Sequence, residues 1–108
     1  MNERERRINA VKKLKKALKT SFGDVEIIVF GSLARNNFDF FSDIDVVVLI
    51  DKEVNNEVRK KIFEIAFNIG LEENVLFGVI VKSKKFWKLR GKTDFPLFSI
   101  IEKEGITI

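Results

Sequence analysis

Two short groups of residues that could do chemistry lie near the middle of this 108-residue chain. The first is Phe30-Gly31-Ser32-Leu33-Ala34-Arg35, and the second, Asp43-Ile44-Asp45, begins eight residues after it. Glycine lets an anion approach the backbone, and a helical turn beside it directs free N–H groups at that anion. Two carboxylates at i and i+2 of a strand point to the same side, where a divalent cation would neutralise them. Together these groups predict a site for a metal ion and a phosphate chain.

The composition narrows the chemistry further, because the chain has neither cysteine nor histidine. Thiol nucleophiles, zinc sites of the Cys/His kind and every dyad that needs a histidine are therefore excluded. Carboxylates, hydroxyls, lysines and arginines remain to carry any reaction. Hard oxygen ligands favour Mg²⁺ or Mn²⁺ over softer metals.

Charge and hydropathy are those of an ordinary globular chain, except that basic residues are concentrated near its start. The net charge is +4, and residues 1–20 hold eight Lys/Arg against Glu3 and Glu5. A basic helix can attract nucleic acid, although a solvated helix face explains the pattern more simply. No apolar run is long enough to span a membrane, and the basic start lacks the features of a signal peptide. We expect one domain over 1–108, located in the cytoplasm.

Apolar periodicity predicts the elements that must position these residues. Three stretches rich in β-branched residues have strand length, and a fourth short segment reads as a tail or an edge strand: 25–30, 43–50, 75–81 and 106–108. Helical spacing predicts helices over 3–19, 55–69, 84–89 and 93–104, with Gly70 and Gly105 ending two of them. Ser32 is a candidate N-cap of a short helical turn through Arg35.

This alternation of helices and strands predicts an α/β fold of the order α-β-α-β-α-β-α, with a small mixed sheet of three to four strands flanked by helices. For Gly31-Ser32 and the two aspartates to serve one site, the end of the first strand must lie beside the start of the second. Those strands would then be antiparallel. The second and third, joined by a helix, would be parallel.

Aromatic residues gather at two further places. Phe38, Phe40 and Phe41 are too many for an exposed loop, so we expect them to pin the loop onto the core. A base-stacking wall or a partner-binding patch are the alternatives. Phe63 and Phe67, four residues apart, either widen the buried face of their helix or leave an apolar ridge for a partner.

The signature Phe30 to Arg35, followed by Ser42-Asp43-Ile44-Asp45-Val46, resembles that of the minimal nucleotidyltransferases of the DNA polymerase β-like superfamily. The order of the flanking elements agrees, and so does the stretch Leu97 to Gly105. The resemblance covers nearly the whole chain. It implies transfer of a nucleoside monophosphate from a nucleoside triphosphate, usually ATP, to an acceptor, with release of pyrophosphate.

The resemblance also implies roles for individual residues. Asp43 and Asp45 would be the catalytic, metal-binding carboxylates, and the triphosphate would be bound by Gly31, Ser32, Arg35 and Ser42. Asn36 stands where family members commonly carry glycine, a minor departure because asparagine tolerates a left-handed backbone. The larger departure is that active members have a third carboxylate on the third strand, whereas the corresponding position falls near Val79. Glu72 and Glu73 lie too far upstream, and Asp39 is the nearby spare acid.

Three functions stay open at this point. The chain is an active nucleotidyltransferase, acting by resemblance on a helical partner of the HEPN type as the antitoxin of a toxin–antitoxin pair. Alternatively, it is a weak or inactive nucleotide-binding partner module, for which the missing acid and the ridge of Phe63 and Phe67 argue. The third and least favoured is a nucleic-acid binder that uses the basic first helix and the stretch from Lys82 to Lys92. A homodimer is compatible with each.

Overall fold

The computed structural model describes residues 1–89 and 96–108. Within them the chain forms, in order, α1 (Glu3–Phe22), β1 (Val25–Phe30), α2 (Gly31–Ala34), β2 (Ile44–Ile50), α3 (Asn56–Glu73), β3 (Phe77–Ser83), α4 (Lys84–Leu89), α5 (Pro96–Glu104) and β4 (Ile106–Thr107). The predicted α/β fold with a small mixed sheet is confirmed. No helix in the described ranges has the length and apolar character needed to cross a bilayer.

The four strands form one sheet in the order β3-β2-β1-β4. As predicted, β1 and β2 are antiparallel and β2 and β3 are parallel. The terminal segment is an edge strand, since β4 pairs antiparallel with β1 through Ile28 and Val29. The sheet is therefore mixed, and β1 lies in its interior, as its apolar character on both faces predicts.

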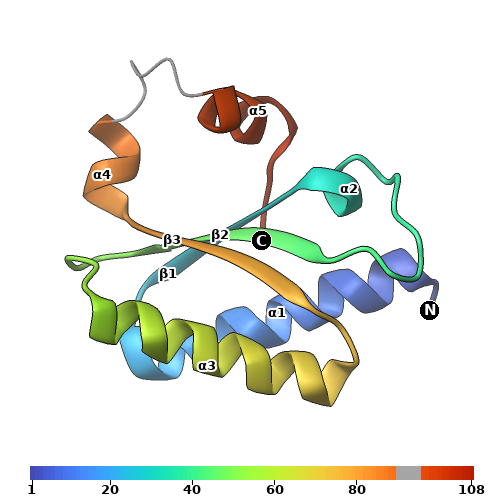
Figure 1. Ribbon diagram of the computed structural model, residues 1–108, viewed down its shortest axis with the longest axis horizontal. Coiled ribbons are helices and arrows are strands. Elements are labelled where there is room, and N and C mark those ends of the chain that lie inside the picture. Colours follow the sequence, from blue (N-terminus) through green and yellow to red (C-terminus); the bar gives the residue numbers. More distant parts are fainter. Residues whose placement is uncertain (90–95) are drawn as a thin grey trace.

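Helices cover the two faces of the sheet in separate layers, with α1 and α3 on one side and α4 and α5 on the other (Figure 1). The short α2 follows the end of β1, and its Leu33 packs in the same core cluster as α1 and α3. The alternation of β2 decides which residues meet each layer. Val46 and Val48 pack into the core under α1 and α3, whereas Val47 and Leu49 pack with Trp87 of α4 and Ile101 of α5. Because side chains alternate along a strand, Asp45 lies on the face of Val47 and Leu49.

Helix α3 ends later than expected, at Glu73 rather than before Gly70. Gly70 is buried inside the helix, and its carbonyl accepts a hydrogen bond of 3.0 Å from the N–H of Val75 as the chain turns back. Asn74, with φ of 55°, is the left-handed residue that ends the helix. A Cβ at Gly70 would lie 2.7 Å from the Val75 carbonyl, so this glycine permits a close turn rather than a helix stop.

Several other boundaries differ from the expectations, among them the end of α1, which lies at Phe22 instead of residue 19. Ser32 is not the N-cap of α2, because that helix begins at Gly31 and its cap residue is Phe30, which makes no side-chain cap hydrogen bond. β3 runs from Phe77 to Ser83 instead of 75–81. The expected start of the last helix at Thr93 lies outside the described residues, and its end before Gly105 is confirmed.

Candidate functional site

The end of β1 lies beside the start of β2, as the pairing of the two sequence groups requires. Phe30, the last residue of β1, pairs with Asp45. On the other side of β2, Asp45 pairs in parallel register with Gly78 of β3. Asp45 therefore lies on β2 between β1 and β3, and Asp43 lies just before β2 begins.

Two glycines flank the carboxylate of Asp45. A Cβ on Gly31 would collide with its Oδ2, and a Cβ on Gly78 would lie 2.9 Å from its Oδ1. Gly31 has φ of 73°, a left-handed conformation that side chains disfavour. The carboxylate is thus held in a slot whose two walls carry no side chain, directly beside the helical turn that contains Ser32.

The electrostatics of this slot are unfavourable for a bare anion. Burial raises the pKa of the Asp45 carboxyl, and the nearby charge of Asp43 raises it further, while Arg35 lowers it. None of the described residues gives either carboxylate an ion pair or a side-chain hydrogen bond. A divalent cation bound between the two carboxylates would remove this repulsion.

The raised pKa of Asp45 predicts how stability depends on pH without metal. In the unfolded chain this carboxyl titrates near its ordinary value of 3.8, below its pKa in the folded state. Its contribution to stability is therefore full below pH 3.8 and is lost as the pH rises through the folded-state pKa. Thermal unfolding of wild type and Asp45→Asn in EDTA should show a gap in Tm that widens as the pH rises. A constant gap would contradict the raised pKa.

Arg35 lies close enough to Asp45 to lower its pKa, and it is anchored from the other side by α5. Its Nη1 forms an ion pair of 3.1 Å with the carboxylate of Glu104. Both side chains are partly exposed. This pair connects the signature after β1 to the C-terminal stretch that contains Glu104, and it leaves the guanidinium with free donors near the aspartates.

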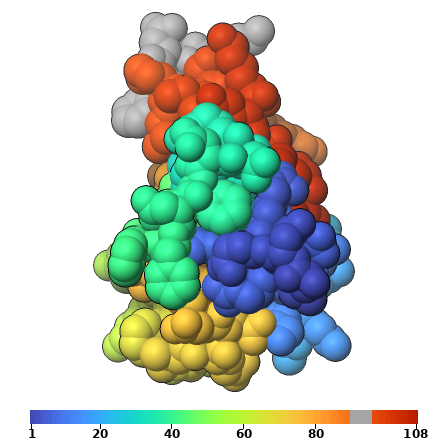
Figure 2. Space-filling view, turned by 90° about the vertical axis from the view of Figure 1, so that its right-hand side faces the viewer, coloured from blue at the N-terminus to red at the C-terminus, as the bar shows by residue number. Residues whose placement is uncertain are grey.

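The loop that leads into β2 is organised by a residue that the sequence analysis did not single out. Arg7 of α1 is only 3% exposed, and its guanidinium donates to the carbonyls of Ser42 (2.7 Å), Phe40 (3.0 Å) and Asp39 (3.3 Å). Figure 2 shows this green segment between α2 and β2 lying against the dark blue start of α1. Arg7 lies four residues before Val11 on the apolar stripe of α1, and that spacing is the signal for its burial.

Within the loop, the side chains of Ser42 and Asp39 bond to each other. The Ser42 hydroxyl donates to Asp39 Oδ1 at 3.2 Å and accepts from the Asp39 N–H at 3.0 Å. Asp39 also accepts from the N–H of Phe41 at 2.8 Å. The predicted phosphate ligand Ser42 and the spare acid Asp39 are thus engaged in the turn before Asp43.

The three phenylalanines of this loop divide into two kinds. Phe38 packs against the main core, with the Arg7 guanidinium 5.2 Å from its ring centroid, so the expectation of pinning is confirmed for it. It is wrong for Phe40 and Phe41, which are 71% and 88% exposed and stack edge to face. With Asp43 they line a cavity of about 360 Å³ that reaches the end of α3.

Val79 is not the position that faces the aspartates. It pairs with Val46 and packs into the core under α1 and α3, on the opposite face of the sheet from Asp45. The β3 residues on the face of Asp45 are Gly78, Ile80 and Lys82, since alternate residues of a strand share a face. No residue of β3 is acidic. Glu73, as expected, does not approach the site and pairs with Lys13 at 2.9 Å.

The slot predicts a large effect of adding one methyl group at Gly31. Gly31→Ala places a side chain at positive φ and against Asp45 Oδ2, so we expect a loss of about 2–3 kcal/mol in the free energy of unfolding. Gly23→Ala is the matched control, because Gly23 has nearly the same φ of 72° but open space around it. Chemical denaturation of both should show the larger loss at Gly31. Equal losses of unfolding free energy would mean that Asp45 moves away from the added methyl group at little cost.

Comparison with known proteins identifies the family of this chain. Residues 11–104 match the family model described as "Nucleotidyltransferase domain". The chain is also 33% identical over 103 residues to a protein of Methanocaldococcus jannaschii named "Putative protein adenylyltransferase MJ0141", an alignment that covers 94% of this chain and 97% of that protein. The chain belongs to the nucleotidyltransferase domain family.

Proposed function

We propose that the protein transfers a nucleoside monophosphate, from ATP as donor, to a hydroxyl group of a protein acceptor, with Mg²⁺ or Mn²⁺ as cofactor. The observation that carries this proposal is the slot at Asp45, where the carboxylate lies between Gly31 and Gly78 with Asp43 two residues before it. The family match supports nucleotidyl transfer in general. The name of the relative supports a protein acceptor.

The residues of the slot fit a hard divalent cation. Asp43 and Asp45 offer carboxylate oxygens that no described side chain uses, and their mutual repulsion favours a cation between them. The described residues contain no group of three or more acidic side chains that could hold a metal by themselves. A bound cation would supply charge neutralisation at the transferred phosphate, and its remaining ligands would be water and phosphate oxygens.

The other residues of the site fit the binding of a phosphate chain. The first N–H groups of α2 have no acceptor within that helix, and the Ser32 hydroxyl has no partner among the described residues. Gly31 lets phosphate approach the backbone there. Arg35, held by Glu104, would contact phosphate oxygens and so orient the donor. Because β3 carries no acid, Asp43 and Asp45 are the described carboxylates placed to take up the acceptor proton.

The cavity beside Asp43 suggests where an acceptor approaches. Phe40 and Phe41 form an exposed aromatic wall of this cavity, which also contains Asp43 itself. An aromatic wall suits a tyrosine-bearing or apolar segment of a protein. A HEPN-type helical protein, as in a toxin–antitoxin pair, is the acceptor that we propose to test first.

The decisive experiment incubates the protein with α-³²P-labelled ATP, Mg²⁺ and the candidate acceptor, and follows label on the acceptor. The expected result is covalent label that requires Mg²⁺ and is lost in the double variant Asp43→Asn/Asp45→Asn. Label that persists in this variant would overturn the proposal. ATP labelled at the γ-phosphate is the control, because nucleotidyl transfer releases that phosphate with pyrophosphate.

A second function is favoured by one observation, the lack of an acid on β3 beside Asp45. With two carboxylates the protein would bind nucleotide and metal but turn over slowly, and so act as a nucleotide-binding module. Nucleotide binding measured by calorimetry, with no transfer to any acceptor, would select this function.

The arrangement of α1 weighs against a nucleic-acid binder. Four of its eight basic side chains bind other groups of the same chain: Arg7 and Lys15 bind backbone carbonyls, Lys13 pairs with Glu73, and Arg6 binds Glu3. Half of the basic residues are then left to form a basic stripe. A binding assay at two salt concentrations would reveal such a function by a steep loss of affinity.

A further inference from the structure

The outer edge of β3 is open. In the described sheet β3 pairs only with β2, so half of the backbone N–H and C=O groups of its seven residues have no strand partner. Exposed edges of this length are usually blunted or paired, because they invite association with another chain. Lys82 is the single charged residue within β3. The edge is therefore a candidate for pairing with a further strand.

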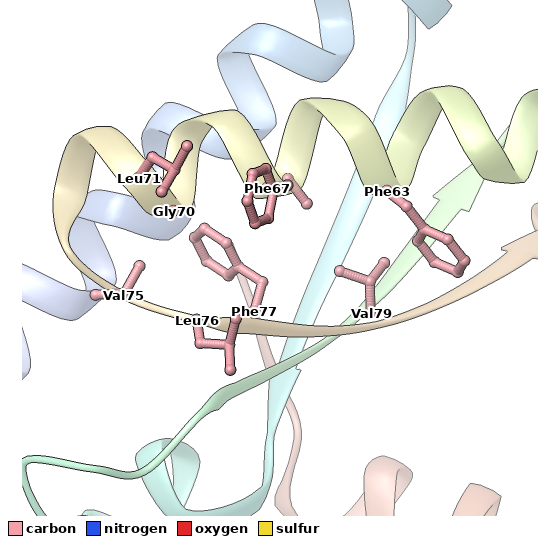
Figure 3. Close-up of a pocket in the computed structure, with 9 residues that line it drawn as sticks. Phe63, Phe67, Gly70, Leu71, Val75, Leu76, Phe77 and Val79 are labelled. Atoms are coloured by element: carbon pink, nitrogen blue, oxygen red, sulfur yellow. The ribbon is translucent and has the colours of Figure 1, made fainter.

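Beside this edge lies an apolar groove of about 340 Å³ between α3 and β3. Phe63, Phe67 and Leu71, spaced four residues apart on α3, line it and are 44%, 60% and 67% exposed. Figure 3 shows that Phe77 and Val79 point from β3 towards this helix. The open edge and the apolar side chains thus form one surface that a strand and a helix could cover together.

We propose that a second copy of this chain covers the surface, with the two β3 strands antiparallel about a two-fold axis at Ile80. Ile80 is the midpoint of β3, so this register is the one in which all seven residues pair, Phe77 with Ser83 of the second copy. Directly opposite residues of an antiparallel pair point to the same face of the sheet. In this register each residue of β3 lies opposite a residue of the second copy that points to its own face. The axis also brings the two α3 helices together over the groove, which is isologous packing.

Charge complementarity favours a second copy over an unrelated partner. The start of β2 is acidic, with Asp43 and Asp45, whereas the end of β3 and α4 is basic, with Lys82, Lys85 and Lys88. An antiparallel pairing of β3 with itself sets the basic end of each copy against the acidic end of the other. The interaction occurs twice, once on each side of the two-fold axis.

The same register brings Lys82 of the second copy to the candidate site. It pairs with Gly78, which itself pairs with Asp45, and all three positions share one face of the sheet. Two strand spacings separate the Cα atoms of Asp45 and this lysine, about 10 Å in all. Gly78 places no side chain between them. Within the described chain Lys82 makes no ion pair, and its ammonium lies 5.0 Å from the Phe86 ring centroid.

An ammonium at this place would contribute a residue to the site in trans. Lysine binds phosphate as a point charge, so Lys82 of the second copy would contact the donor phosphates beside Asp45. This step rests on the proposed nucleotidyl transfer, whereas the pairing of the two β3 strands does not. The two steps can therefore be tested separately.

Single-cysteine variants test the pairing, because the natural chain contains no cysteine. In the proposed register Ile80→Cys faces its own copy across the axis and should form an intermolecular disulfide on mild oxidation. Lys82→Cys is the matched control on the same face of the same strand, because it opposes Gly78 and lies far from its own copy. The wild type should have twice the 12.5 kDa chain mass by light scattering, and Phe63→Glu should be a folded monomer.

The proposal is overturned by a monomeric wild type at all concentrations, by equal cross-linking of both cysteine variants, or by a dimer that Phe63→Glu leaves intact. A complex that forms only when a different protein is added would also overturn it. Cross-linking of Ile80→Cys in a protein that shows no transfer would instead support the pairing and reject the proposed activity.

Complementation tests the contribution in trans. Asp45→Asn and Lys82→Ala should each transfer little nucleotide alone. When they are mixed under conditions that exchange subunits, half of the dimers are mixed, and each holds one site with both native residues. We expect about a quarter of wild-type activity to return. If a mixture that does exchange subunits recovered no transfer activity, Lys82 of the second copy would not contribute to the site.

Discussion

Asparagine at position 45 is expected to abolish nucleotidyl transfer and, at the same time, to make the metal-free protein more stable. The carboxylate of Asp45 lies between Gly31 and Gly78, and Asp43 is close enough to raise its pKa. Its ionised form is therefore unfavourable in the folded protein without metal. The amide has nearly the same shape and no charge, so it relieves the repulsion but offers a poor ligand to a divalent cation.

The two effects have different sizes. In the proposed mechanism Asp45 is a metal ligand. Loss of such a ligand removes several kcal/mol of transition-state stabilisation, so we expect kcat/KM to fall by about a thousandfold. The stability gain is smaller because solvent partly reaches Asp45, and we expect about 0.5 kcal/mol at neutral pH. For a chain of this size that corresponds to a rise in Tm of about 2–4 °C.

The measurement is thermal unfolding in EDTA and in excess Mg²⁺, together with transfer of label from ATP. In EDTA the variant should unfold at the higher temperature, and Mg²⁺ should raise the Tm of the wild type only. Asp39→Asn is the matched control, because Asp39 is engaged in its own turn. An Asp45→Asn variant that Mg²⁺ stabilises as much as wild type would show that the cation binds elsewhere.

The sequence carries enough information to predict the strands and the meeting of the two motif groups. β1 is apolar on both faces, which predicts an interior strand, and the need to bring Gly31 to Asp45 predicts that β1 and β2 are antiparallel. These predictions depend on the apolar pattern of each strand and on the assumption that Gly31 and Asp45 serve one site. They do not depend on how the helices pack against the sheet.

The residue beside Asp45 on β3 could not be predicted in the same way. Its identity depends on the register between two strands joined by a long helix, and a shift of one residue moves each side chain to the other face. The expected position near Val79 differs by one residue from Gly78, which the structure places beside Asp45. The expected end of α3 contributed to this one-residue difference, because the helix continues past Gly70 to Glu73 and β3 begins at Phe77 rather than at residue 75.

The loop before Asp43 also depends on tertiary contacts that no local pattern contains. Three phenylalanines within four residues look alike in sequence, yet one is part of the core and two are exposed. What separates them is the buried guanidinium of Arg7, which holds the loop carbonyls from a helix more than thirty residues earlier in the chain. The first twenty residues contain eight lysines and arginines, and Arg7 differs from the other seven in being buried.

Arg7→Met should therefore weaken both the fold and the site, although Arg7 is not a catalytic residue. Methionine keeps the apolar stem but removes the donor to the carbonyls of Ser42 and Phe40, while the Asp39 carbonyl keeps its hydrogen bond from the Ser42 N–H. The hydrogen bonds that are lost come from a buried charged donor to partly buried carbonyls, and we expect about 2–4 kcal/mol less free energy of unfolding. Since Asp43 follows Ser42 directly, we expect transfer activity to fall by about tenfold to a hundredfold.

A local readout separates this positioning role from a general loss of stability. Chymotrypsin cleaves after aromatic residues, and Phe40 and Phe41 are exposed on a backbone that Arg7 holds. Arg7→Met should be cleaved at these two residues faster than at other sites, and Arg7→Lys should recover only part of the protection because it lacks the planar fork. Arg6→Met is the neighbouring control, since Arg6 makes no contact with the loop carbonyls. If cleavage in Arg7→Met increased equally at all aromatic sites, Arg7 would support the fold as a whole and not this loop in particular.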